Sequence, residues 1–283
     1  MTAGVAAVQS GDHRAAGIRF EAAAREARAF GSLDPRYAVS LYRLAVAYHK
    51  QGRYADAEPQ YKQALTLTVR IHGEQHPYVA TQLSDYALLH MEQGQHALAE
   101  PLYKRLLAIQ EKALGPNHLA VAKTLNDLAE LYREIGRYSL ALPLYQRALS
   151  ITEVSLGREH PEVATLLNNL ALDYSGLQRY FEAEPLFQRS LAIREKNYGP
   201  DHQRVATVLN NLADLYRAQG RGDDAEPLYL RAIEITERSL GPRSPDLATM
   251  MGNLLKLYRA QERTEEAQAL QQRLEQLQKK PAS

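Results

Sequence analysis

The sequence predicts an all-α fold: a right-handed superhelical solenoid of stacked helix-turn-helix repeats. The first observation is a fixed period, because the stretch from His160 to Asp201 has near-copies spaced 42 residues apart. The second is that apolar residues within each copy recur at helical spacing on both sides of a short break. Units of this length cannot bury their apolar faces alone, so they stack on their neighbours. The near-copies begin at Asp34, His76, His118, His202 and Ser244.

This period divides the chain into a half-repeat and six repeats. The half-repeat occupies residues 1–33, where residues 11–31 fall on the spacing of a second helix and the matching first helix is missing or reduced to residues 5–9. The chain either caps itself with this helix or is a fragment of a longer protein. The last repeat ends in a polar helix, residues 264–280, which is expected to cap the stack before a frayed tail. The repeats span residues 34–75, 76–117, 118–159, 160–201, 202–243 and 244–283.

The first helix of each repeat is expected to follow an N-cap residue, and four repeats have proline at its first position, which forfeits no intrahelical bond. Four repeats carry histidine at the N-cap, which invites a metal-binding interpretation. However, Asp34 and Ser244 hold the same position and are standard N-cap types. Equivalent positions also lie about one repeat apart, too far to share an ion at ~2 Å. Capping is therefore predicted, and no metal, for His76, His118, His160 and His202.

Glycine, alanine and aromatic residues at fixed positions predict how the two helices of a repeat pack. Gly52, Gly94, Gly136 and Gly220 allow the chain to reverse between helices, and the fourth repeat breaks at residues 175–178. Small side chains let the helices approach at the near end of ~8–10 Å. The core alanines are Ala45, Ala87, Ala129, Ala171 and Ala213, with Ala57, Ala99, Ala141, Ala183, Ala225 and Ala267. The core aromatics are Tyr61, Tyr103, Tyr145, Phe187 and Tyr229.

These residues resemble the tetratricopeptide repeat family, with Leu167 in the family's tryptophan position and Ala171 in its glycine position. The sequence is most similar to the kinesin light chain type. It shares that type's long unit, its Leu-Asn-Asn-Leu-Ala run at 167–171 and 209–213, its Ala-Glu-Pro-Leu run and its Leu-Gly-Pro connection. The resemblance implies that groove asparagines, with lysine and arginine, hold linear peptides containing tryptophan flanked by acidic residues.

Composition narrows the function classes. The 283 residues include no cysteine, which excludes disulfides and cysteine-ligated metals. A net charge of +1 argues against binding nucleic acid or an anionic membrane through net charge. No apolar run approaches the ~20 residues that span a bilayer, and residues 1–14 lack a signal-peptide pattern, so a cytoplasmic location is expected. No phosphate loop or nucleophile motif is present, so neither catalysis nor a cofactor is expected.

The candidate binding residues lie on the first helices. Residues at i, i+4, i+7 and i+11 share one helix face, and polar residues dominate there where a core would demand apolar ones. A solvated helix face is the simpler interpretation. Yet asparagine is a poor helix former, and its amide can donate to and accept from the backbone of an extended ligand. The candidates are Arg43, Lys50, Asp85, Lys123, Asn126, Asp127, Glu130, Asn168, Asn169, Asn210, Asn211, Asp214 and Asn253.

The charge of this face differs from what the resemblance implies. Repeats 2 and 3 present Asp85, Glu92, Asp127, Glu130 and Glu134, which should repel an acidic peptide. If the face is rotated by one position, arginines join it and the sign becomes mixed, so the sign of the groove charge stays open.

The sequence therefore predicts a non-catalytic adaptor or scaffold that binds an extended peptide or a partner's helix in its concave groove. The alternative is a self-associating structural solenoid or the sensor arm of a larger signalling protein. The partner is expected to be a protein or peptide, with no nucleic acid and no membrane, and the oligomeric state stays open.

Overall fold

A computed structural model describes residues 11–31 and 33–278. Within these residues the chain forms thirteen α-helices and no strand, which confirms the predicted all-α class. The chain divides into two compact units, which meet in sequence between Ile135 and Gly136. We call them unit 1 and unit 2 and describe each by itself. The predicted first helix of the half-repeat, at residues 5–9, lies outside the described residues.

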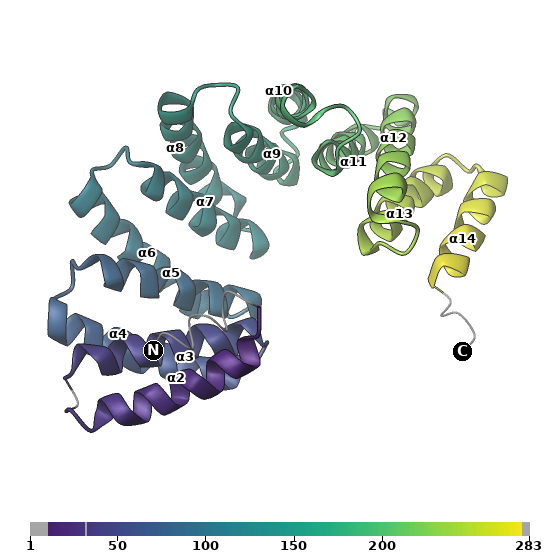
Figure 1. Ribbon diagram of the computed structural model, residues 1–283. Coiled ribbons are helices and arrows are strands. Elements are labelled where there is room, and N and C mark those ends of the chain that lie inside the picture. Colours follow the sequence, from purple (N-terminus) through teal and green to yellow (C-terminus); the bar gives the residue numbers. More distant parts are fainter. Residues whose placement is uncertain (1–10, 32, 279–283) are drawn as a thin grey trace. The chain divides into compact units, whose positions relative to one another are not determined.

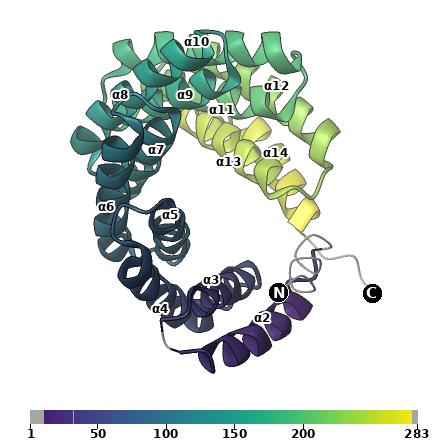
Figure 2. The same ribbon diagram turned by 60° about the vertical axis from the view of Figure 1, so that its left-hand side comes forward.

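Unit 1 contains the half-repeat helix and five further helices, each packed against the next along the chain. In Figure 2, α3 and α5 lie on the inner side of this unit, and α4 and α6 lie on its outer side. The first helices of the repeats therefore share one face. The helices are α2 (His13–Arg28), α3 (Pro35–Lys50), α4 (Tyr54–His72), α5 (Pro77–Glu92), α6 (His96–Leu114) and α7 (Leu119–Glu134).

Unit 2 continues the alternation of 16-residue and 19-residue helices up to the last helix, which has 15 residues. Figure 1 shows it from α8 in teal to α14 in yellow. The predicted capping helix at 264–280 is α14, which is described up to Gln278. The helices are α8 (Tyr138–Leu156), α9 (Pro161–Gly176), α10 (Tyr180–Tyr198), α11 (Gln203–Ala218), α12 (Gly222–Leu240), α13 (Pro245–Ala260) and α14 (Thr264–Gln278).

Each first helix of the repeats begins after a side-chain cap, as predicted. The histidine before the helix has extended backbone geometry, and its Nδ1 atom accepts from the backbone N–H two residues later. This bond satisfies one of the helix's unpaired N–H groups. The accepting atoms lie 3.1 to 3.2 Å from their donors in His76, His118, His160 and His202.

The chain reversals follow the glycine prediction in most repeats but not in the fourth. Gly52 and Gly94 adopt left-handed φ angles of 72° and 68°, a region that costs other residues energy. In the fourth repeat α9 continues through Gly176, and the left-handed residue is Gln178, at φ 58°. The break therefore begins two residues later than predicted, and Gln178 holds the position of Gly52 and Gly94 in repeats 1 and 2.

The predicted core is confirmed. The first-helix and second-helix alanines are buried in every repeat, and the five core aromatics are at most 3% exposed. Alanine at the helix crossings leaves room for the aromatic ring one turn further on. Because the second helices supply these rings, the first helices keep one polar face free of core packing.

Candidate functional site

A cleft of about 400 Å³ opens on the first-helix face of unit 1. It brings together four of the predicted binding residues, Asp85, Lys123, Asp127 and Glu130. Its volume falls within the range of ~300–1,000 Å³ typical of ligand sites. The lining comes from α5, α6 and α7 and consists of Ser84, Asp85, Leu88, Met91, Glu92, Tyr103, Lys123, Asp127, Glu130 and Glu134.

The carboxylates of α5 contact tyrosine and histidine side chains of α3 and α4. Tyr42 Oη donates to Asp85 Oδ2 over 2.6 Å. Glu92 Oε2 accepts from Tyr54 Oη over 3.1 Å and lies 3.0 Å from His49 Nε2. These bonds fix the positions of the two carboxylates without placing a lysine or arginine beside them.

The carboxylates of α7 differ in how close their hydrogen-bond partners lie. Glu130 Oε1 accepts from Arg133, one turn along the same helix, over 3.0 Å. Glu134 Oε2 lies 2.8 Å from His96 Nε2. Asp127 accepts one long bond of 3.4 Å from the neighbouring Asn126 amide. Burial raises the pKa of Asp127, and the nearby charge of Glu130 also raises it. The hydrogen bond from Asn126 and the charge of Lys123 lower it, but by less.

Tyr103 is a core residue that also lines this cleft. Its side chain is only 3% exposed, yet its hydroxyl makes no hydrogen bond with any residue the structure describes. The equivalent Tyr61 hydroxyl lies 3.2 Å from His49 Nδ1, and the equivalent Tyr229 hydroxyl donates to Asp214 over 2.7 Å. Burial raises the pKa of Tyr103, and the nearby carboxylates, Asp127 first, raise it further.

The sequence explains why Tyr103 lacks a partner. His49 and Asp214 stand 12 and 15 residues before their tyrosines. At the same spacings Tyr103 has Met91 and Leu88, which are apolar and also line the cleft. The sequence prediction assigned Tyr103 to the core alone and missed its place in the cleft. The signal that could have revealed it is this pair of apolar residues.

In unit 2 the predicted asparagines bond to one another. Asn211 Nδ2 donates to Asn168 Oδ1 over 2.9 Å, and Asn253 Nδ2 donates to Asn210 Oδ1 over 3.2 Å. Asn168, Asn210 and Asn253 are all buried. We call these two bonds the asparagine ladder; they tie α9 to α11 and α11 to α13. Asn169 is half-buried, and its Oδ1 lies 3.5 Å from the Asn168 amide.

Asp214 anchors a second network in unit 2. Its Oδ1 accepts from Arg217 over 2.9 Å and from the Tyr229 hydroxyl over 2.7 Å. Its Oδ2 accepts from Asn253 over 3.0 Å, and Lys256 donates to Asn253 Oδ1 over 3.0 Å. The polar side chains of unit 2 that were predicted to bind a ligand are thus largely engaged with each other.

Gly176 accounts for a further difference between the units. A Cβ atom at this position would lie 2.7 Å from the Tyr138 ring, so the absence of a side chain lets that ring pack over α9. The equivalent residues in repeats 2 and 3 are Glu92 and Glu134. Unit 1 therefore has two carboxylates in its cleft at a position where unit 2 has a glycine beneath an aromatic ring.

Three further predicted residues do not line the cleft: Asn126, which donates to Asp127, and Arg43 and Lys50. Arg43 is half-buried and lines a separate cavity of about 160 Å³ with Tyr42, Tyr78 and others. Its guanidinium lies 5.9 Å from the centre of the Phe20 ring. Lys50 is exposed at the end of α3. The structure therefore joins four predicted residues in one cleft and leaves these three out of its lining.

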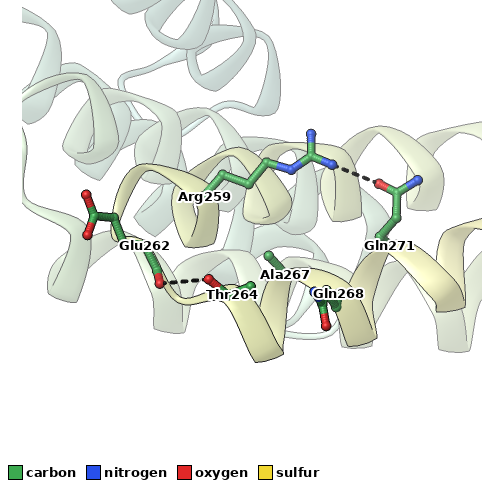
Figure 3. Close-up of a pocket in the computed structure, with 6 residues that line it drawn as sticks. All are labelled: Arg259, Glu262, Thr264, Ala267, Gln268 and Gln271. Carbon is green, nitrogen blue, oxygen red and sulfur yellow. Dashed lines mark hydrogen bonds between the residues drawn. The ribbon is translucent and has the colours of Figure 1, made fainter.

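A larger hollow, of about 560 Å³, lies between α13 and α14. Figure 3 shows its lining, in which Arg259 donates to Gln271 over 3.2 Å. Gln271 takes the position that holds Tyr229 one repeat earlier. A smaller polar side chain in place of an aromatic ring explains the hollow, because the terminal helix leaves part of the usual core space unfilled.

Two further features of the described residues bear on the kind of site. No group of three or more histidine, aspartate or glutamate side chains among them is placed to hold a metal ion. Across residues 11–31 and 33–278, every helix is too short or too polar to cross a membrane.

Paired helices, alanine crossings and an open cleft on the first-helix face define a helical repeat protein. The sequence matches the tetratricopeptide repeat family over residues 38–78, 78–154, 162–221 and 204–280. These matches cover more than half of the chain, which therefore belongs to the tetratricopeptide repeat family. Domains of this family generally bind protein partners and are typically non-catalytic.

Solved structures place the chain near kinesin light chain-like members. BtubC (BKLC) from P. vanneervenii is 26% identical over 82% of this chain and 94% of its own, with a TM-score of 0.66. Nearly identical repeats assigned to a kinesin light chain of Podospora anserina are 26% identical over 72% of this chain and 96% of theirs, with a TM-score of 0.62. No curated protein sequence matches the chain.

A more distant structure shares the fold. The tetratricopeptide repeat protein from Parabacteroides merdae is 21% identical over 98% of this chain and 91% of its own, with a TM-score of 0.69. This likeness extends the comparison over nearly the whole chain and supports the all-α repeat architecture.

Proposed function

We propose that this protein is a non-catalytic adaptor that binds an extended peptide segment of a partner in the groove formed by its first helices. The cleft of unit 1 carries the proposal, because it gathers Asp85, Lys123, Asp127 and Glu130 from two successive first helices. Polar side chains along such a face can bond the backbone and side chains of an extended ligand.

The described geometry favours unit 1 over unit 2 as the main binding surface. In unit 2 the amides of Asn211 and Asn253 already donate to neighbouring first helices. In unit 1 the carboxylates of Asp85, Asp127 and Glu130, on the equivalent face, line an open cleft. A ligand that supplies donors gains bonds there without breaking existing ones.

A peptide-display selection tests this function. Random linear peptides are selected on the purified chain, and their affinities are then measured for the wild type and for Leu88→Trp, which fills the cleft without changing charge. Leu88 is 40% exposed, so the larger side chain does not disturb the core. We expect a loss of affinity of at least about tenfold.

The matched control is Leu230→Trp, because Leu230 is 47% exposed on α12 in unit 2. It should leave the affinities unchanged, and circular dichroism should show the same helix content for both variants. Selection of no peptide, or equal binding to wild type and Leu88→Trp, would contradict a peptide groove in unit 1.

A further inference from the structure

The cleft of unit 1 carries an excess of negative charge. Five carboxylates line it, those of Asp85, Glu92, Asp127, Glu130 and Glu134, and Lys123 is the lining residue of opposite charge. Arg133, which does not line the cleft, forms an ion pair with Glu130 and offsets part of its charge. A cleft lined mainly by one sign of charge focuses the electrostatic field on a ligand of the opposite sign.

A second observation, independent of charge, concerns Tyr103. Its side chain lines the cleft and is only 3% exposed, and its hydroxyl has no hydrogen-bond partner within the described residues. A donor from a ligand in the cleft can therefore bond this hydroxyl without displacing a partner within the chain. The equivalent hydroxyls of Tyr61 and Tyr229 have partners from their own repeats.

The shape of the cleft fits a long side chain with a charged end. Leu88 and Met91 supply an apolar wall next to the carboxylates. Lysine and arginine bury their aliphatic stems against apolar surface and extend their charged groups to polar partners. A compact metal ion fits less well, because no three carboxylate or histidine side chains of the described chain converge at ligating distance.

We infer that this cleft binds a lysine or arginine side chain of a basic, extended segment in the partner protein. The cationic group contacts Asp127 and donates a hydrogen bond to the Tyr103 hydroxyl oxygen, while its stem packs on Leu88 and Met91. Asp85, Glu92 and Glu134 attract further basic residues along the segment. This inference rests on the proposed peptide groove and adds the charge class of the partner, which is the opposite of the acidic motifs that the family resemblance implies.

Two fluorescent probe peptides of equal length test it, one alternating arginine with serine and the other glutamate with serine. Fluorescence anisotropy measures their affinity for the wild type, for Asp127→Asn/Glu130→Gln, and for the control Asp223→Asn/Glu265→Gln. The control makes the same change of charge at two exposed carboxylates of α12 and α14. We expect the arginine probe to bind and the cleft variant to weaken it at least about tenfold, against less than about twofold for the control.

Tyr103→Phe gives a second readout that does not alter net charge. It should weaken the arginine probe about three- to tenfold, because one hydrogen bond to a charged group is lost. Its fold should be unaffected, since the hydroxyl it removes is bound to no described residue.

The outcomes separate this inference from the proposed function. Equal losses in the cleft and control variants, or no binding of the arginine probe, would overturn the basic-segment inference. If display-selected peptides are sensitive to Leu88→Trp but carry acidic residues, the groove stands and the charge class is wrong. If no selected peptide is sensitive to Leu88→Trp, the proposed function itself fails.

Discussion

The two units share one fold but use one position of the first helix in opposite ways. In unit 1 this position holds Asp85 and Asp127, after Arg43 in repeat 1; in unit 2 it holds Asn169, Asn211 and Asn253. An amide both donates and accepts, whereas an ionised carboxylate only accepts. The amides of Asn211 and Asn253 can therefore bond the preceding first helix, and they do so. The carboxylates must obtain donors from elsewhere.

This difference gives the polar faces of the two units different roles. In unit 2 the polar side chains hold consecutive repeats together, whereas in unit 1 they line a surface that a partner can reach. In unit 2 the ladder satisfies the polar face internally, and Gly176 allows the Tyr138 ring to cover part of it. In unit 1 the polar face stays open as a cleft lined by carboxylates and by the Tyr103 side chain, whose hydroxyl has no partner among the described residues. A single repeat architecture thus supports a closed face and an open face in the same chain.

The largest expected effect follows from replacing an amide of the ladder by a carboxylate. Asn253→Asp replaces the Nδ2 donor, which now bonds Asn210 Oδ1 and Asp214 Oδ2, with an oxygen. These two acceptors would then face a third acceptor in place of a donor. We expect the free energy of unfolding to fall by about 2 kcal/mol, offset in part by the nearby Lys256. Urea unfolding measures the loss, and hydrogen exchange should show it in α11 and α13.

The reverse change in unit 1 is the control for this prediction. Asp127→Asn removes a charge from a half-buried position without removing a short hydrogen bond, so it should not destabilise the chain. An unchanged urea midpoint for Asn253→Asp would show that the ladder contributes nothing to stability, and the contrast between the units would then have no energetic basis.

Much of the fold could be predicted from the sequence because it depends on local and periodic signals. The spacing of alanines and aromatics, the proline starts and the histidine caps each act within one repeat, and all are found as predicted. The turn of the fourth repeat was misplaced because Gly176 was interpreted as a chain reversal. Its actual role depends on Tyr138, 38 residues earlier, which no local pattern indicates.

The candidate site was less predictable, because its properties arise between repeats. The face could be identified from the helical period, and four of its residues do share a cleft. The asparagines that can still bond a ligand are set by hydrogen bonds between residues 43 apart in sequence, such as the bond from Asn211 to Asn168. The place of Tyr103 in the cleft depends on two apolar residues of the preceding helix. Such pairings follow from the packing of consecutive repeats and not from the pattern within one.

A second prediction compares two tyrosines at equivalent positions. Tyr229→Phe removes the donor to Asp214 and the acceptor of a weak bond from Arg217, and it should lower the free energy of unfolding by about 1–2 kcal/mol. Tyr103→Phe removes a hydroxyl with no partner among the described residues and should change stability by less than about 0.5 kcal/mol. Urea unfolding of the two variants gives the difference, and an equal loss in both would show that Tyr103 is bonded in the free protein.

The smallest expected effect concerns the pH dependence of Asp127. Burial, with Glu130 nearby, holds the pKa of this carboxyl above its ordinary value of 3.8, against the opposing effects of Asn126 and Lys123. Between the ordinary pKa and the raised pKa of the folded chain, the folded chain binds the proton more tightly than the unfolded chain does. The contribution of Asp127 to stability therefore falls as pH rises through this range. Asp127→Asn should therefore gain stability on the order of 0.5 kcal/mol at neutral pH and nothing below the ordinary pKa.

Urea midpoints of the wild type and Asp127→Asn across this pH range measure the gain. The control, Glu182→Gln, should show the opposite sign. Arg179 donates to Glu182 and holds the pKa of that carboxyl below its ordinary value, so the wild-type residue stabilises the chain at neutral pH and loses this effect as pH falls. If the difference between Asp127→Asn and wild type does not change with pH, the cleft of unit 1 imposes no electrostatic cost on its own carboxylate, and the attraction for a cationic side chain loses one of its supports.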